Sequence, residues 1–221
     1  SDVCSSDLND DHGGSPITRL QALVNSFNAQ CQRTGLDAEV IVVDNASRDQ
    51  TAELVRDTFP WMRLVASPDN LGFAAGNNLA AQHAHGRYLL LLNPDAVPAQ
   101  GALARGIALM NQHPKAGLAG GELRGADGSR QPSARMFPRL RDEIFTLTGL
   151  AARFPNSRLL ARLDRRWADP EQAALVDWIP GAFVFIPSAL FAHLGGFDER
   201  FFMYYEEVDF CRRIQQAGYH I

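Results

Sequence analysis

The stretch YLLLLNPDAVP, residues 88–98, joins a run of leucines to Asn93, Pro94 and Asp95. The leucines predict a short strand that is buried on both faces. Asn and Pro are turn-forming residues, so the strand should end where they begin. A core strand therefore delivers a single carboxylate, that of Asp95, to a turn at its carboxyl end.

The segments around this stretch alternate between strand and helix patterns. Short apolar runs predict strands, and longer amphipathic runs predict helices. The expected strands cover residues 38–47, 62–67, 88–95 and 115–121, and the expected helices cover 16–34, 48–59, 72–86 and about 99–112. Ser47 followed by Gln50 is a candidate capping box for the second helix. This order predicts an α/β fold with a mostly parallel sheet flanked by helices, in which ligands bind at the carboxyl ends of the strands.

The second half of the chain is less regular. A hairpin is expected around Asp127 and Gly128, and the arginine-rich residues 138–170 are weakly helical and predict a surface flap. Residues 174–221 then give a strand, a short helix, an aromatic loop and a final helix. No repeat or linker divides the chain, so one domain is expected over residues 13–221. Residues 1–12 show no hydrophobic period and are interpreted as a non-native or disordered leader.

The composition is that of a globular protein. Of the 221 residues 46% are hydrophobic and 21% are charged, and the net charge of −4 gives no general reason to expect nucleic-acid binding. The three cysteines lie far apart without a CxxC pair, which argues against a disulfide framework or a zinc site. No apolar run reaches the ~18 residues that a membrane helix needs. We therefore expect a cytoplasmic protein.

Asp44 and Asn45 end the strand expected over residues 38–47. One interpretation is that Asp44 accepts hydrogen bonds from a ribose hydroxyl or a base N–H. The alternative is that the segment only forms an Asx-turn and caps the next helix. These residues alone leave both interpretations open.

Asn70, Gly72, Gly76, Asn77 and Asn78 cluster where the third helix is expected to begin. Free backbone N–H groups and small side chains at such a place suit the close approach of an anionic ligand. The glycine spacing matches neither GxGxxG nor a P-loop. A tight turn followed by a small-residue helix packed on the sheet explains the pattern equally well.

Acidic residues occur at two further places. Asp95 could complete a Mg²⁺ or Mn²⁺ shell that otherwise uses diphosphate oxygens and water, although Asn-Pro-Asp is also a plain turn. Glu206, Glu207 and Asp209 crowd together beside two tyrosines, which can raise a pKa enough to make a general base. Asp209 also has a structural explanation, because Arg213 stands four residues further along the same helix face.

Four segments together resemble the family 2 inverting glycosyltransferases, particularly their rhamnosyltransferase-like bacterial branch. They are VVDNASRDQT, NLGFAAGNN, LLLLNPDAVP and GGFDERFFMYYEEVDFCRRIQQAGY, in that order and spacing. The resemblance covers roughly residues 38–221. It implies a GT-A (Rossmann-like) fold and transfer of a sugar, with inversion, from a nucleotide diphosphate donor to a hydroxyl.

The resemblance also implies roles for particular residues. Residues 13–120 would form the nucleotide-sugar-binding half, and residues 121–221 the acceptor-side half. Glu207, Glu206 and Asp209 are the candidate bases, and Asp95 is the candidate ligand of a divalent cation (Mg²⁺ or Mn²⁺). The residues expected to bind the nucleotide sugar are Asp44, Asn45, Asn70, Gly72, Asn77 and Asn93.

The implied partners are a dTDP- or UDP-sugar donor and a glycan or lipid-linked glycan acceptor, in cell-surface polysaccharide synthesis. No nucleic-acid partner is expected, and peripheral association with the inner face of the cell membrane is compatible with this role. The competing hypotheses are a non-catalytic module that binds sugar nucleotides or glycans, and a nucleotidyltransferase. The nucleotidyltransferase is disfavoured because no Gly-rich loop bearing Arg and Lys follows a first strand.

Three departures from the family pattern matter. Asn93 stands where the first Asp of the family's DxD motif would be, so metal ligation would rest mainly on Asp95. Glu207 stands where the base is usually Asp, which leaves the choice among Glu206, Glu207 and Asp209 open. The family's first strand should precede residue 16, where the leader stands, so the chain is interpreted as a fragment truncated at both ends. Loss of that strand would leave backbone groups unpaired, and the fragment alone is expected to fold poorly or to be inactive.

Overall fold

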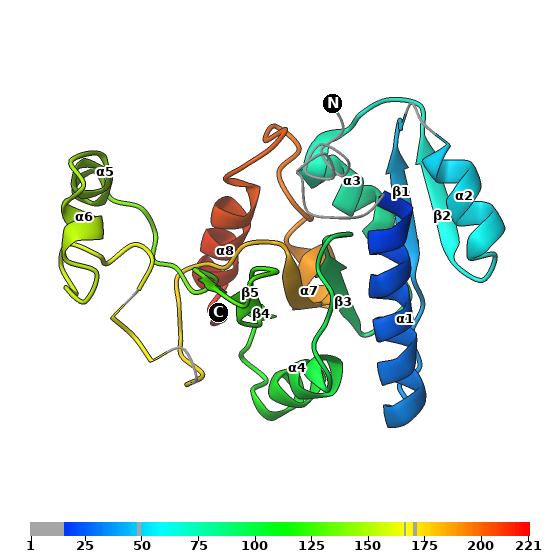
Figure 1. Ribbon diagram of the computed structural model, residues 1–221, viewed down its shortest axis with the longest axis horizontal. Helices are drawn as coiled ribbons and strands as arrows, with labels where there is room; N and C mark the ends of the chain where they lie inside the picture. Colours follow the sequence, from blue (N-terminus) through cyan, green and yellow to red (C-terminus); the bar gives the residue numbers. More distant parts are fainter. Residues whose placement is uncertain (1–15, 48–49, 166, 170–171) are drawn as a thin grey trace.

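The computed structural model describes residues 16–47, 50–165, 167–169 and 172–221. In its first half, helices and strands alternate (Figure 1). The elements are α1 (Pro16–Thr34), β1 (Ile41–Asn45), α2 (Thr51–Thr58), β2 (Arg63–Ser67), α3 (Gly72–Ala81), β3 (Tyr88–Leu92), α4 (Ala102–Gln112) and β4 (Ala119–Gly120). Each element falls within the range that the hydrophobic pattern predicts, so this part of the prediction is confirmed.

The second half contains the hairpin, the flap and the final helix that the sequence indicates. Its elements are β5 (Leu123–Arg124), β6 (Arg130–Gln131), α5 (Leu140–Leu147), α6 (Leu150–Arg153), β7 (Phe183–Pro187), α7 (Ser188–His193) and α8 (Glu206–Gln216). β5 and β6 pair antiparallel around a turn at Gly128, whose φ of 78° is the left-handed conformation that glycine adopts without strain. The flap carries α5 and α6.

The strands form separate sheets rather than one. β1 and β2 pair in parallel, with Ile41 opposite Arg63 and Asn45 opposite Ser67. β7 lies between β3 and β4 and is antiparallel to both. The predicted α/β class is confirmed, whereas among the strands of the described residues only β1 and β2 pair in parallel. The reason is that residues 121–182 return the chain to the end where β3 stops, so β7 must run back in the opposite direction.

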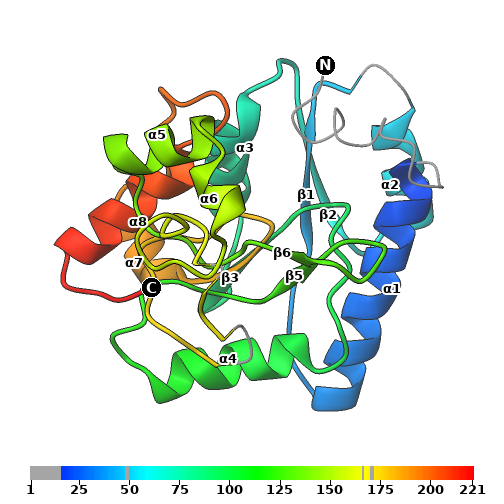
Figure 2. The ribbon, with the colours of Figure 1, turned by 60° about the vertical axis from the view of Figure 1, so that its left-hand side comes forward.

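Helices cover both faces of the sheet formed by β3, β7 and β4 (Figure 2). Successive side chains of a strand point to opposite faces. Val184 and Ile186 of β7 are therefore buried with residues of α7 and α8, whereas Phe185 is buried against Leu103 and Met110 of α4. This alternation places one hydrophobic core cluster on each face of the sheet.

β1 and β3 begin at the same end of the protein and run in the same direction. The carboxylate of Glu39, just before β1, accepts a hydrogen bond from the backbone N–H of His85, just before β3, at 2.6 Å. Both strands run upward in Figure 1, toward the end where α3 and α8 begin. Within the described residues each of the two strands has a strand partner on one side only. Their carboxyl ends, which carry Asn45 and Asn93, therefore face the same region.

Some local expectations need correction or lie outside the description. The capping box is wrong, because α2 begins at Thr51 and Gln50, its N-cap residue, makes no side-chain cap hydrogen bond. The leader expected over residues 1–12 lies outside the described residues. None of the helices in the described part of the chain is long and apolar enough to span a bilayer.

Candidate active site

Asn45 connects the end of β1 to the first turn of α3. Its buried side-chain amide donates to Asn70 Oδ1 at 2.9 Å, and its Oδ1 accepts from the backbone N–H of Leu71 at 2.8 Å. Asn70 Oδ1 in turn accepts from the backbone N–H of Gly72 at 3.0 Å. The structure thus brings together three of the residues selected from the sequence, and it uses their amides to hold the loop in place.

Gly72 brings the loop of residues 201–205 against the start of α3. Its φ is 75°, and a Cβ at this position would overlap the carbonyl oxygen of Phe202. The same carbonyl accepts a hydrogen bond from the backbone N–H of Phe73 at 3.1 Å. Only glycine satisfies both the left-handed conformation and the close approach. The aromatic loop expected from the sequence is therefore fixed beside the small-residue helix.

Glu207 lies at the end of β3, although more than a hundred residues separate it from that strand. Its Oε1 accepts a hydrogen bond from the backbone N–H of Gly181 at 3.1 Å. The carbonyl of the next residue, Ala182, accepts from the backbone N–H of Asn93 at 3.1 Å. Two consecutive residues, Gly181 and Ala182, therefore connect Glu207 to the Asn93–Asp95 turn.

Glu206 differs from Glu207 in that it is buried, with 2% of its surface exposed. Burial, and to a lesser extent the neighbouring charge of Glu207, raise the pKa of Glu206 to about 7. Its Oε2 has no hydrogen-bond partner within the described residues. Near neutral pH the carboxyl group of Glu206 is therefore only partly ionised. The half-buried Glu207 is the better placed of the two to meet a substrate.

Asp209 is held in an ion pair. Its Oδ2 lies 2.7 Å from Nε of Arg213, one helical turn further along α8. Arg213 also donates to the carbonyl of Leu194 at 2.8 Å. The pair thus ties α8 to the end of α7, which is the structural role that the spacing predicts.

The remaining predicted site residues lie at the same strand ends or on α3. Asp44 is half-buried and accepts a hydrogen bond from the backbone N–H of Ser47 at 3.3 Å, as an Asx-turn does. Asn77 donates to the carbonyl of Phe73, one turn back in α3, at 2.8 Å. Asp95 is exposed, and its carboxylate has no hydrogen-bond or ion-pair partner in the described part of the chain. Asp95 is therefore free to bind a ligand.

The residues present set a limit on any metal site. Within the described residues, no three His, Cys, Asp or Glu side chains gather closely enough to enclose an ion. The described His, Cys, Asp and Glu side chains therefore do not enclose a cation by themselves. The exposed carboxylate of Asp95 does fit a Mg²⁺ or Mn²⁺ ion that takes its other oxygen ligands from a diphosphate and water, because such ions commonly keep several non-protein ligands.

Asn78 is a residue whose role the sequence did not reveal. Its Oδ1 accepts from the backbone N–H of Phe197 at 2.8 Å, and its Nδ2 donates to the carbonyl of Phe197 at 2.9 Å and to Glu199 Oε1 at 3.0 Å. The amide thus anchors the GGFDE segment, residues 195–199, to α3. The only signal in the sequence was a pair of asparagines in a helix of small residues, which does not say which of the two reaches out.

Tyr204 and Tyr205 carry backbone strain next to this site. Both have a φ of 69°, in the left-handed region that costs a non-glycine residue about 1–2 kcal/mol. Both rings are exposed, Tyr204 to 70%. Such strain is found most often at functional sites, where the surrounding structure enforces it. The acidic start of α8 is thus preceded by two aromatic rings that the fold holds toward solvent.

A sequence model of one protein family, glycosyl transferase family 2, matches residues 17–162. The chain belongs to this family. The match covers the carboxyl ends of β1 and β3 and the first turn of α3, where the predicted donor-side residues lie. The protein therefore contains a glycosyltransferase domain.

Relatives with curated descriptions include two bacterial rhamnosyltransferases. The N-acetylglucosaminyl-diphospho-decaprenol L-rhamnosyltransferase of Mycobacterium tuberculosis is 29% identical over 217 residues, which cover 93% of this chain and 69% of that protein. The rhamnosyltransferase WbbL of Escherichia coli is 29% identical over 157 residues, which cover 66% of this chain and 55% of that protein. The resemblance to rhamnosyltransferases that the motifs indicate is confirmed.

A solved structure supports the fold assignment. The mannosyltransferase of Pyrobaculum calidifontis, solved with GDP-mannose and Mn²⁺, has a TM-score of 0.58 to this structure at 23% sequence identity. The match covers 92% of this chain, and the chain spans 50% of that protein. The GT-A fold expected from the resemblance is confirmed.

Proposed function

We propose that this domain transfers a sugar, with rhamnose as the leading candidate, from a nucleotide diphosphate donor to a hydroxyl of a glycan or lipid-linked glycan acceptor. The curated relatives include rhamnosyltransferases of two bacteria, and the description of the mycobacterial protein contains a lipid-linked saccharide. The donor would be a dTDP- or UDP-sugar. The observation that carries the proposal is the hydrogen-bonded path from Glu207 through Gly181 and Ala182 to Asn93, because it supports a shared site for a base and the donor diphosphate.

In the proposed reaction Glu207 acts as the general base. Its carboxylate takes the proton of the acceptor hydroxyl while the acceptor oxygen forms a bond to the anomeric carbon. The bond from that carbon to the diphosphate oxygen breaks on the opposite face, and the electron pair leaves with the nucleoside diphosphate. The configuration at the anomeric carbon is therefore inverted. The N–H of Gly181 donates a hydrogen bond to Glu207 Oε1 and so fixes the position of this carboxylate.

The donor side of the site is proposed to use the ends of β1 and β3. Asp44 would accept hydrogen bonds from the nucleoside, and the loop held by Asn45, Asn70 and Gly72 would line the pocket. Asp95, beside Asn93, would hold the divalent cation. A bound Mg²⁺ or Mn²⁺ would offset the negative charge that builds up on the departing diphosphate.

The acceptor side is proposed to use the loop of residues 201–205. Its exposed tyrosines stand immediately before the acidic start of α8, and aromatic rings offer an apolar face and a polar tip to a glycan. An acceptor bound there would meet Glu207 from the solvent side. We propose that the reaction takes place in the cytoplasm, at the inner face of the cell membrane, as a step of cell-surface polysaccharide synthesis.

The test is a donor panel measured with the product of the complete gene. Nucleoside diphosphate release should require a donor and an acceptor together, and one of dTDP-rhamnose and the UDP-sugars should give the highest rate. The anomeric configuration of the product, read by NMR, should be opposite to that of the donor. Retention of configuration would contradict the assignment of Glu207 as base, and binding of donors without any transfer would favour a non-catalytic module.

A further inference from the structure

The helix α5 buries a charged side chain and exposes apolar ones, whereas a surface helix usually does the opposite. Its buried side chain is a carboxylate, that of Asp142, which is 2% exposed. Leu140 and Leu147 are exposed to 81% and 86%, and Ile144 between them is also exposed. The three apolar residues are spaced i, i+4 and i+7, so they form one stripe along the helix. A helix of a globular protein normally turns such a stripe toward the core.

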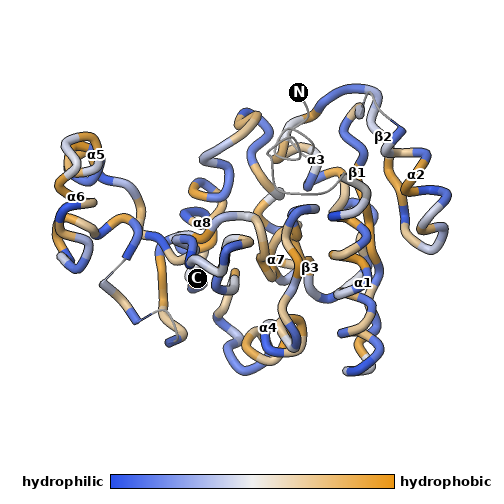
Figure 3. Tube along the Cα trace, viewed as in Figure 1, coloured by the Kyte–Doolittle hydropathy of each residue, from blue (hydrophilic) through white to orange (hydrophobic). Residues whose placement is uncertain are grey.

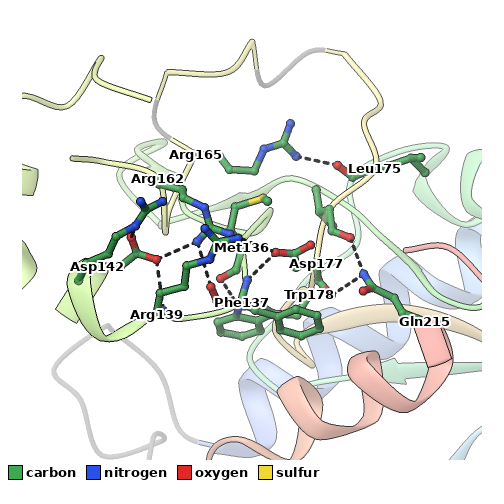
Figure 4. Close-up of polar contacts among 12 residues, drawn as sticks. Met136, Phe137, Arg139, Asp142, Arg162, Arg165, Leu175, Asp177, Trp178 and Gln215 are labelled. Atoms are coloured by element: carbon green, nitrogen blue, oxygen red, sulfur yellow. Dashed lines mark hydrogen bonds and ion pairs between the residues drawn. The ribbon is translucent and has the colours of Figure 1, made fainter. Parts of the chain in front are cut away.

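Contacts of Asp142 with Arg162 hold the polar side of α5 against the rest of the protein, so the apolar side faces solvent. Asp142 Oδ2 accepts from Nη1 of Arg162 at 2.8 Å and from the backbone N–H of Arg139 at 3.2 Å. Arg162 also donates to the carbonyl of Phe137 at 3.0 Å and lies 3.6 Å from Asp177 (Figure 4). Rotating α5 to bury its leucines would separate the Asp142 carboxylate from Arg162, which is costly for a buried charge.

The apolar stripe continues onto α6, which packs against α5. Leu150 and Phe154 are exposed, and Leu159 follows a few residues later. Figure 3 shows apolar residues on both helices, which project from one side of the molecule. Together Leu140, Ile144, Leu147, Leu150, Phe154 and Leu159 make up what we call the flap face. So many exposed large apolar residues on one small element mark an interaction surface.

The charge around the flap face is positive. Residues 139–165 contain six arginines and three acidic residues, which gives +3 in a chain whose net charge is −4. Asp142 is paired with Arg162, and Asp164 lies 3.8 Å from Arg135. The exposed Arg139 and Arg153 stand next to the apolar residues. The flap face therefore combines an apolar stripe with basic residues at its border.

We propose that α5 and α6 bind the surface of an anionic lipid membrane, with the flap face inserted among the headgroups and the arginines on lipid phosphates. Apolar side chains flanked by arginines are the pattern of helices that lie in the membrane interface. A second copy of the chain fits the face less well, because a symmetric contact would bring the same arginines together. Anionic lipids supply both the apolar phase and the opposite charge.

This inference extends the proposed function, because a lipid-linked acceptor would be presented at the same surface. In Figure 2 α5 and the loop that precedes α8 lie on the same side of the molecule, and in Figure 1 both lie in its upper half, with α5 projecting further outward. That loop also exposes Phe202 and Met203. Docking through the flap face would thus turn the acceptor side of the site toward the membrane.

The test is flotation of the complete gene product with vesicles of phosphatidylcholine alone or mixed with phosphatidylglycerol, without donor or acceptor. We expect binding to the anionic vesicles that weakens as salt is added. The variant Leu140→Ser/Leu147→Ser should lower the partition coefficient by about tenfold or more. Arg139→Gln/Arg153→Gln should lower it several-fold on anionic vesicles and leave binding to neutral ones unchanged. The control Leu54→Ser, at an exposed leucine of α2 on the far side, should behave as wild type.

The outcomes are decisive for the membrane proposal. No flotation of the wild type, or equal flotation of Leu140→Ser/Leu147→Ser, would overturn it. Self-association in sedimentation experiments that the leucine variant abolishes, without vesicle binding, would identify the flap face as an interface between copies and would also overturn it. Flotation as expected in a protein that releases no nucleoside diphosphate would keep the membrane site and reject the proposed function instead.

Discussion

Replacing Glu206 with glutamine should remove a pH-dependent loss of stability that this buried carboxyl imposes. Burial raises the pKa of Glu206 from 4.5 to about 7 in the folded protein. A pKa difference of this size corresponds to at most about 3 kcal/mol between the two states of the chain. Because relaxation of the surrounding structure reduces the cost of a buried charge, we expect an effect of about 1–2 kcal/mol.

The direction follows from which state holds the proton more tightly. Below about pH 4.5 both the folded and the unfolded chain keep Glu206 protonated, so the residue gives no pH dependence. Between about 4.5 and 7 the unfolded chain loses the proton first, which favours unfolding as the pH rises. Above about 7 both states are ionised, and the loss of stability is complete. A glutamine carries no such proton, and its amide can still donate to Glu207.

The assay is urea unfolding of wild type and Glu206→Gln at several pH values between about 4 and about 8. The difference in the free energy of unfolding should shift in favour of the variant by about 1–2 kcal/mol across this range. Glu53→Gln, at an exposed position on α2, is the matched control and should give a constant difference. A difference between wild type and Glu206→Gln that does not change with pH would refute the reasoning.

Two further substitutions test the framework of the site. Gly72→Ala should destabilise the protein by about 2–3 kcal/mol in urea unfolding, because it adds a clash with the Phe202 carbonyl to left-handed strain. Gly128→Ala, with a similar φ and open space around it, should cost only about 1 kcal/mol, and equal losses would contradict the close approach. Asp209→Asn should weaken the ion pair with Arg213 and lower the free energy of unfolding by about 1 kcal/mol. Sugar transfer should continue in this variant. Loss of transfer with normal stability would assign Asp209 a catalytic role.

The strands and helices could be predicted because their signals are local. The leucines of β3 followed by Asn93 and Pro94 predict the strand and its end, although only Leu91 is fully buried and the other residues of β3 are half-buried. The acidic start of α8 was likewise visible in the sequence. The sequence pattern did not predict which distant segments pair with one another. The antiparallel insertion of β7 depends on the end to which residues 121–182 return the chain, and no hydrophobic period encodes that.

The same limit applies to single side chains. Nothing near Asn78 in the sequence indicates that its amide binds both backbone groups of Phe197, because that contact spans more than a hundred residues. The burial of Asp142 is a similar case, since a weakly helical arginine-rich segment gives no sign that its leucines face outward. Pairwise long-range contacts decide these orientations, and they are visible only once the fold is assembled.

The most direct test of the account is the rate of sugar transfer by Glu207→Gln in the complete gene product. The account predicts that kcat falls by about 10²–10⁴-fold, because the acceptor proton loses its base, while donor binding changes little. Glu206→Gln and Asp209→Asn, on the same helix, should keep most of the activity. Turnover by Glu207→Gln close to that of wild type, with either neighbouring variant inactive, would contradict the assignment of the base and with it the proposed site.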